Sequence, residues 1–301
     1  MDMRRHDRYS FVPLPDRPVY DWPGGKRLAV CFCNNIEWFA FMEGLGSDHT
    51  QPGAAQTTRN YAWRDYGNRV GLWYLFDLFD DLGLPLSHNL NAALLDNAPG
   101  IADRILARGD EPIGHGRTNS ERQDGMSRAD EAQLIADTND AFVRHFGLSP
   151  RGWLGPYIVQ SQNTPELLKA AGYDYMLDWP ADDQPFWMRT DEGPILSVPY
   201  SIEINDSPAQ VFRHHTGIQF EQMMIDQFDE MLHQSRRYPL VYSAVLHPFV
   251  IGQPFRLRAL RRALDHILRH RDDIWIATPG EIAAYAAGLP EGTLPPPPGK
   301  G

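Results

Sequence analysis

The sequence has only two cysteines in 301 residues and no long apolar run. Cys31 and Cys33 lie two residues apart on one predicted strand, where neighbouring side chains on the same face rarely form a disulfide. A disulfide-stapled secreted fold is therefore not expected. No segment approaches the ~20 apolar residues of a membrane span, and the charged N-terminus has no apolar signal core. We therefore expect a cytoplasmic protein with no membrane partner.

Positive charge is also scarce. The chain has 28 Lys and Arg against 39 Asp and Glu, which gives a formal net charge of −11. Nonspecific nucleic-acid binding needs a cationic surface that displaces counterions, and docking on anionic lipid needs the same kind of surface. The charge balance therefore argues against nucleic acid as a partner and leaves a small-molecule substrate as the expected one.

Strand and helix patterns alternate along the chain. Strands are predicted at 27–33, 85–89, 111–114, 151–154, 173–177, 195–200, 240–246 and 274–277. Helical patterns lie between them at 66–83, 99–108, 127–147, 164–172, 217–235 and 254–269. Helix caps are predicted at Ser127 and Thr164, and a last helix begins after a cap at Thr278. Residues 41–63 lack periodicity and predict a long loop.

This alternation predicts parallel strands joined by crossover helices. About seven such units follow one another without a linker, which favours one closed or nearly closed α/β barrel over two separate halves. We expect a single domain over 1–301, with an N-terminal arm at 1–25 and a flexible Pro-rich tail at 288–301. No G-x-G-x-x-G or Walker loop follows a strand, which argues against nucleotide cofactors.

Polar and aromatic residues follow five of the predicted strands. They are Asn34–Trp38, His115–Asn119, Trp153–Pro156, Asp178–Trp179 and His247. In parallel barrels the chemistry lies at the carboxyl ends of the strands. The convergence of these residues on one rim predicts an active site there.

The order and spacing of these motifs resemble the polysaccharide deacetylase superfamily (NodB homology, carbohydrate esterase 4) over about residues 27–285. The resemblance implies a distorted (β/α)₇ barrel and a hydrolase. Asn35-Ile36-Glu37 matches an Asn-x-Glu element of the allantoinase-like and cyclic-imide-hydrolase-like members, and 66–71 and 251–254 are also similar to that subgroup. Tetramers occur in the family, and the aromatic content of the chain agrees with a homo-oligomer.

One departure from the family concerns its metal site, which uses an Asp of the first motif and two His of the second. The matching positions here are Asn35, His115 and Asn119. A zinc site needs three anionic or imidazole ligands, and a neutral amide oxygen is a weak ligand. We therefore expect a degenerate site with no metal and no other cofactor, with zinc as the alternative.

The resemblance and the chemistry of amide hydrolysis together assign roles. Glu37 is predicted as the base, His247 as the acid that protonates the leaving nitrogen, and His115 as the group that holds water or the oxyanion. Asp178 would orient His247, as the family's fourth motif does. The predicted substrate-binding residues are Asn35, Asn119, Trp153, Pro156, Trp179 and Arg69.

The predicted function is hydrolysis of a small cyclic amide, imide or ureide. The alternatives are a metal-dependent N-deacetylase of an amino sugar and a ligand-binding pseudoenzyme.

Some of the predicted site residues can also have purely structural roles: Glu37 can pair with Arg69, and His115 and His247 can be hydrogen-bonded core histidines. His266 and His270 have the i,i+4 spacing of a helical zinc pair, but they lack the Glu of H-E-x-x-H and lie among arginines. This favours two surface histidines without a metal over a zinc site.

Overall fold

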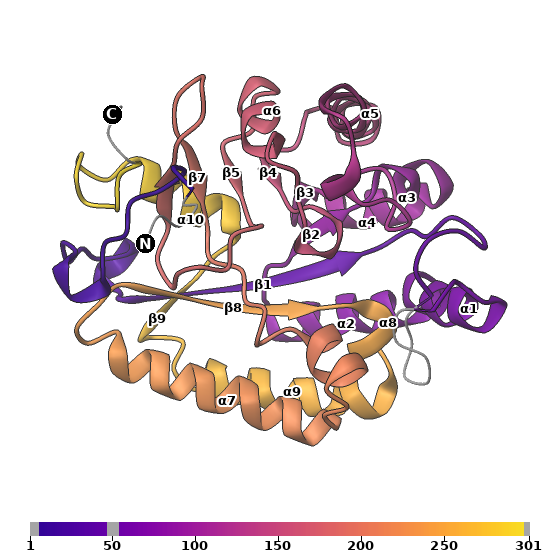
Figure 1. The fold of residues 1–301 in the computed structure, drawn as a ribbon. Coiled ribbons are helices and arrows are strands. Elements are labelled where there is room, and N and C mark those ends of the chain that lie inside the picture. Colours follow the sequence, from indigo (N-terminus) through magenta and orange to yellow (C-terminus); the bar gives the residue numbers. More distant parts are fainter. Residues whose placement is uncertain (1–5, 47–53, 298–301) are drawn as a thin grey trace.

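The computed structural model describes residues 6–46 and 54–297, so that parts of the predicted arm, loop and tail (1–5, 47–53 and 298–301) lie outside the described residues. Within them, nine strands form one sheet that curls strongly (Figure 1). The strands are β1 (Leu28–Ile36), β2 (Ser87–Leu90), β3 (Glu111–Gly114), β4 (Gly152–Trp153), β5 (Tyr175–Met176), β6 (Phe186–Met188), β7 (Ile195–Ser197), β8 (Leu240–Leu246) and β9 (Ile274–Ile276).

The longest strand, β1, pairs with β2, β8 and β9, and the sheet almost closes on itself. The strand order is β6-β7-β5-β4-β3-β2-β1-β8, and β9 pairs with the first residues of β1. An isolated parallel bridge between Asn205 and Val245 returns the segment after β7 to β8. The predicted distorted α/β barrel is therefore confirmed, and its eight parallel strands lie at the eight predicted places. The hairpin partner β6, which is antiparallel to β7, was not predicted.

The helices cover the outside of this sheet. They are α1 (Thr58–Tyr66), α2 (Leu72–Leu82), α3 (Ala92–Asn97), α4 (Pro99–Arg108), α5 (Arg128–Phe146), α6 (Thr164–Ala170), α7 (Gly217–Gln234), α8 (Pro248–Ile251), α9 (Pro254–Leu268) and α10 (Pro279–Ala287). Figure 1 shows α7 and α9 side by side beneath β1 and β8, with α3 to α6 on the opposite side. Across the described residues, no helix combines the length and the apolar character that a membrane span requires.

Most predicted helices are confirmed, as are the predicted caps at Ser127, which opens α5, and at Thr278, which opens α10. Two expectations need correction. The end of the predicted loop 41–63 is helical, because α1 begins at Thr58 behind an N-cap at Thr57. The cap predicted at Thr164 lies one residue earlier, at Asn163, and the Thr164 hydroxyl donates to Glu131 instead.

A π-helical turn, Gly67–Gly71, joins α1 to α2 and fixes the position of α8. A Cβ atom at Gly71 would lie 2.2 Å from the carbonyl oxygen of Pro248 and one at Gly67 would lie 2.7 Å from the backbone nitrogen of Phe249. Only glycine permits this approach between two backbones. The turn thereby holds the segment that begins at His247 against the carboxyl end of β1.

The period of two along β1 determines which of its side chains reach the active-site end. Val30 and Phe32 face outward and pack with α7 and α9, while Cys31 and Cys33 face the barrel interior among small and aliphatic side chains. Both cysteines are free and fully buried, as expected for small apolar residues. Asn35 continues the inward series at the barrel mouth, so the alternation of the strand delivers its last polar residue to the interior.

Candidate active site

A cavity of about 300 Å³ opens at the carboxyl ends of the strands. Figure 1 shows the arrowheads of β1 and β8 pointing to this end, where α1 and α8 lie. Five of the predicted site residues line it: Asn35, Glu37, His115, Asn119 and His247. The other lining side chains are mainly aromatic and aliphatic, among them Phe39, Trp63, Tyr157, Tyr200 and Phe249.

Glu37 is the carboxylate of this cavity and lies just beyond the end of β1. Its Oε1 is 3.6 Å from His247 Nε2 and 4.0 Å from His115 Nε2. Burial raises the pKa of the Glu37 carboxyl, although His247, Arg64 and a hydrogen bond from Asn119 act in the opposite direction. The two imidazoles therefore face one carboxylate whose affinity for a proton is higher than usual.

His115 follows β3 directly and is held as a neutral imidazole. Its Nδ1 donates to the carbonyl of Leu154 at 2.6 Å, which leaves Nε2 as an acceptor toward the cavity. Burial, with a smaller contribution from His247, lowers the pKa of His115 to about 4. Among the described residues, Nε2 has no hydrogen-bond partner. An unprotonated nitrogen in this position can accept a hydrogen bond from a water molecule but cannot donate one to an oxyanion.

His247 follows β8 and is clamped by Asp206. Its Nδ1 donates to Asp206 Oδ1 at 2.7 Å, and its backbone N–H donates to Oδ2 of the same carboxylate at 2.9 Å. Burial favours the neutral ring, but Asp206 and Glu37 outweigh it, so the pKa of His247 is raised above its ordinary value. The Nε2 atom is thus directed toward Glu37 and suited to carry a proton.

The two asparagines of the expected metal position are engaged with neighbouring side chains. Asn35 Oδ1 accepts from Asn89 at 2.9 Å and from the Tyr200 hydroxyl at 3.2 Å, while Asn35 Nδ2 donates to Tyr200 at 2.8 Å. Asn119 Oδ1 accepts from Asn91 at 3.1 Å. These neutral oxygens are already used as acceptors, so Asn35, His115 and Asn119 do not fit a divalent cation. Asn35 also has its amide N–H groups committed, and it braces the pocket wall.

Two predicted wall residues, Trp153 and Pro156, lie outside the cavity lining. Trp153 is fully buried and packs edge-to-face on Tyr173, with ring centroids 5.5 Å apart. Successive side chains of a strand point to opposite faces, so Trp153 faces the covering helices while Leu154 reaches the cavity. Pro156 is buried, and its neighbour Tyr157 lines the cavity instead.

Asp178, Trp179 and Arg69 also lie elsewhere. Asp178 and Trp179 line a separate cavity beside His6 and Arg8, and Asp178 Oδ1 accepts from the backbone N–H of Gly155 at 2.7 Å. The expectation that Asp178 orients His247 is therefore wrong, because Asp206 occupies that position.

Arg69 is largely exposed and pairs with Asp65 at 3.6 Å. The arginine whose charge acts on Glu37 is Arg64, which stacks over Phe39 and donates to the carbonyl of Leu45. The alternative in which Glu37 pairs with Arg69 is thus also wrong.

Sequence reasoning missed Asp206 and Tyr200 as site residues. Tyr200 is the last residue of the predicted strand 195–200, so the rule that favours strand ends would have included it. Asp206 comes after the end of that strand. Asp206 stands in the polar triplet Asn205-Asp206-Ser207 before Pro208, and the bridge from Asn205 to Val245 places it beside β8. That long-range pairing is the signal that the sequence does not contain.

The sequence is similar to known proteins along most of its length. No protein-family model matches the chain. It is 24% identical over 304 residues to a Schizosaccharomyces pombe protein assigned as a polysaccharide deacetylase, covering 89% of this chain and 93% of that protein. It is also 25% identical over 250 residues to a peptidoglycan deacetylase of Helicobacter pylori, covering 72% of this chain and 84% of that protein.

Two solved structures share the fold over nearly the whole chain. The crystal structure of PuuE allantoinase superposes with a TM-score of 0.84 at 25% identity, and the match covers 96% of this chain and 99% of that one. A Pseudomonas aeruginosa structure assigned to the polysaccharide deacetylases superposes with a TM-score of 0.79 at 28% identity, covering 88% of this chain and 92% of that one.

Proposed function

We propose that this chain, which is similar to polysaccharide deacetylases and to an allantoinase along most of its length, is a hydrolase of C–N bonds other than peptide bonds and that its substrate is a small cyclic amide, imide or ureide. The observation that carries the proposal is the position of Glu37 between the imidazoles of His115 and His247. Its carboxylate lies 3.6 Å from His247 Nε2 and 4.0 Å from His115 Nε2. This arrangement supplies a base, an acid and a water-holding group around one point.

Glu37 acts as the general base in the proposed reaction. A water molecule that donates one hydrogen bond to Glu37 Oε1 and one to His115 Nε2 has its lone pair free to attack the substrate carbonyl carbon. As the C–O bond forms, Glu37 takes a proton from the water. The raised pKa of the Glu37 carboxyl increases its strength as a base, and the neutral state of His115 keeps that nitrogen an acceptor.

His247 acts as the general acid. In its protonated form it gives the Nε2 proton to the ring nitrogen as the C–N bond breaks, so that ring opening yields an acid and a neutral amine or amide nitrogen. Asp206 stabilises the imidazolium form of His247 and fixes its tautomer by accepting from Nδ1. Glu37 and His247 are within reach of each other, so the proton taken from water can return to His247 for the next turnover.

We propose that this reaction proceeds without a metal ion. The support is the donor set: Asn35 and Asn119 offer neutral amide oxygens that already accept hydrogen bonds, and His115 alone offers an available lone pair. The carbonyl is then activated by hydrogen bonding, for which Asn119 carries a second amide N–H beside the one that bonds Glu37.

The size and lining of the cavity support a small substrate. About 300 Å³ lies at the lower end of the range for small-molecule pockets, and the walls combine aromatic rings with a few polar groups. The similarity to PuuE allantoinase over 96% of this chain also favours a cyclic ureide or imide over a long glycan. We further propose that this soluble substrate is met in the cytoplasm.

A turnover panel tests the proposal. Untagged protein is assayed with cyclic ureides, cyclic imides and N-acetylated amino sugars, each with and without a strong chelator. We expect ring opening of at least one ureide or imide at a rate that the chelator leaves unchanged. Activity confined to N-acetylated sugars and abolished by chelation would establish a metal-dependent deacetylase instead, and binding without turnover across the panel would establish a pseudoenzyme.

A further inference from the structure

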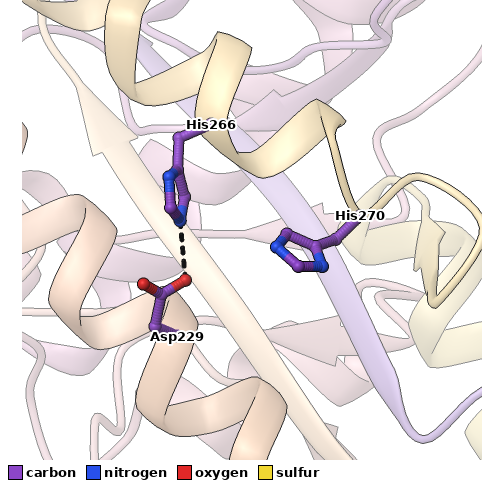
Figure 2. A group of neighbouring side chains, drawn as sticks. All are labelled: Asp229, His266 and His270. Atoms are coloured by element: carbon purple, nitrogen blue, oxygen red, sulfur yellow. Dashed lines mark hydrogen bonds and ion pairs between the residues drawn. The ribbon is translucent and has the colours of Figure 1, made fainter.

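One group of metal-ligating side chains lies outside the active site, on the outer surface where α7 and α9 run side by side (Figure 2). His266 belongs to α9, His270 follows the end of that helix, and Asp229 belongs to α7. Their ligand atoms all lie within 4.8 Å of one another. Among the described residues, this is the one group of three or more His, Cys, Asp or Glu side chains that meets this condition.

The three side chains already face one another without an ion. His266 Nε2 lies 2.6 Å from Asp229 Oδ1, and Figure 2 shows a ring nitrogen of His270 turned toward this pair. Two imidazole nitrogens and one carboxylate oxygen make a set that Zn²⁺ accepts, with a fourth position left for water. Because zinc–nitrogen distances are about 2.0–2.1 Å, side-chain rotation alone can bring the ligands onto one ion.

A buried aromatic ring supports both imidazoles from below. Phe228, the residue before Asp229, is fully buried, and its ring centroid lies 6.1 Å from that of His266 and 5.7 Å from that of His270. This packing restricts the rotamers of both histidines before any ion binds. The entropy lost on binding is correspondingly smaller than for two free surface histidines.

Neighbouring charges affect the site in opposite ways. Asp273 Oδ2 lies 3.5 Å from His270 Nδ1, where a carboxylate can hold the ring in the tautomer that ligates through Nε2. Arg269 donates to His266 Nδ1 at 2.5 Å and must turn away when Nε2 binds a metal, because Nδ1 then carries a proton. Arg269 is exposed, so its side chain has room to move into solvent.

We propose that Asp229, His266 and His270 bind one divalent transition-metal ion, Zn²⁺ or an ion of similar ligand preference, and that this ion ties α7 to α9. The inference is independent of the proposed function. It also means that zinc found in the purified protein need not lie in the catalytic cavity.

Zinc titration by calorimetry tests the proposal on untagged, chelator-treated protein. We expect one equivalent to bind, with affinity lowered about tenfold or more in His270→Ala and in Asp229→Asn. His145→Ala is the matched control, because His145 pairs with Asp96 at 2.9 Å on another surface and is not part of a three-ligand group among the described residues. Circular dichroism checks that each variant is folded. The thermal midpoint should rise with zinc to the same extent in the wild type and in the control, and less in His270→Ala and Asp229→Asn.

Three outcomes would overturn the proposal. The first is a wild type that binds no zinc in the titration. The second is an affinity that falls equally in the His145→Ala control, which would indicate scattered surface binding. The third is loss of the bound equivalent in Glu37→Gln with retention in His270→Ala, which would place the ion in the catalytic cavity and would count against the metal-free reaction as well.

Discussion

His247 makes two hydrogen bonds to the single carboxylate of Asp206, one from its ring Nδ1 at 2.7 Å and one from its backbone N–H at 2.9 Å. Asp206 is fully buried and directly precedes the π-helical turn Ser207–Phe212. The clamp fixes both the position of the residue and the rotation of its ring. Nε2 of His247 consequently faces Glu37 Oε1 at a distance of 3.6 Å.

Replacing Asp206 by Asn should impair the chemical step more than substrate binding. The amide keeps the size of the side chain but no longer stabilises a positive charge on His247. We expect kcat to fall by about 10²–10⁴, the range of a general acid contribution, with KM changed only a few-fold. The alkaline limb of the pH profile should move to lower pH, since Asp206 is what raises the pKa of His247. An unchanged kcat and an unmoved limb would contradict the assignment.

Replacing Asp178 by Asn should leave turnover within a few-fold of wild type, because this carboxyl faces a different cavity. Burial raises the pKa of Asp178 to about 7 from 3.8. A raised carboxyl pKa means that the folded state holds the proton more tightly, so stability falls as pH rises from 3.8 to 7. The buried charge then costs up to about 4 kcal/mol at pH 8. We expect urea unfolding to show that Asp178→Asn is more stable than the wild type at pH 8, and that the difference is smaller at pH 5. A large loss of kcat in this variant would instead place Asp178 in the active site.

The pH dependence of kcat should be bell-shaped, with both limbs set by groups that face each other. Activity needs Glu37 ionised, and burial raises the pKa of that carboxyl above its ordinary 4.5. Activity also needs His247 protonated, and its pKa is raised above 6.5. Glu37→Gln should lower kcat by about 10²–10⁴ at every pH and remove the acidic limb. A variant that kept the acidic limb would assign that limb to another residue.

Trp63→Ala should weaken substrate binding, since Trp63 lines the cavity and packs edge-to-face on Phe249 with ring centroids 4.9 Å apart. If the Trp63 ring contacts the bound substrate, the contact contributes about 0.5–1.5 kcal/mol beyond area burial, so KM should rise several-fold while kcat changes little. Trp179→Ala is the matched control, because Trp179 lines the other cavity and should leave KM unchanged. Equal effects in the two variants would refute the assignment of the pocket wall.

The sequence predicted the strands well because each parallel strand is a short buried run between helices, and the inward position of Asn35 and Glu37 follows from the period of β1. The prediction from sequence failed where a shift of one residue decides which face of the sheet a side chain occupies. In β4, which has two residues, Trp153 points outward and Leu154 reaches the cavity. A slip of one position reverses such an assignment. Asp206 was missed because its place beside His247 depends on a pairing between Asn205 and Val245, residues 40 positions apart.

The same long-range limit applies to the surface metal cluster. The spacing of His266 and His270 is visible in the sequence, but Asp229 lies on another helix, and nothing local predicts that α7 packs against α9 with these residues in register. The helix pair was predictable, whereas its packing was not. Side chains contributed by distant segments therefore account for most of the site residues that sequence reasoning missed or misplaced.

Acid should destabilise the protein in part through His115, and the size of the effect can be isolated. Burial lowers the pKa of His115 to about 4, against 6.5 for an exposed imidazole. Between those values the unfolded chain binds a proton that the folded chain does not, so stability is full above pH 6.5 and falls as the pH decreases toward 4. At about 1.4 kcal/mol per pH unit, this residue contributes a loss of about 2 kcal/mol between pH 7 and pH 5.

His115→Asn removes this titration while keeping a polar side chain that can donate to the Leu154 carbonyl. The measurement is urea unfolding of wild type and variant at pH 7 and pH 5. We expect the wild type to lose about 2 kcal/mol more than the variant between the two pH values, because every other titrating group is common to both chains. Parallel losses would mean that His115 is protonated in the folded state at pH 5, and its Nε2 could then not accept a hydrogen bond from the attacking water at that pH.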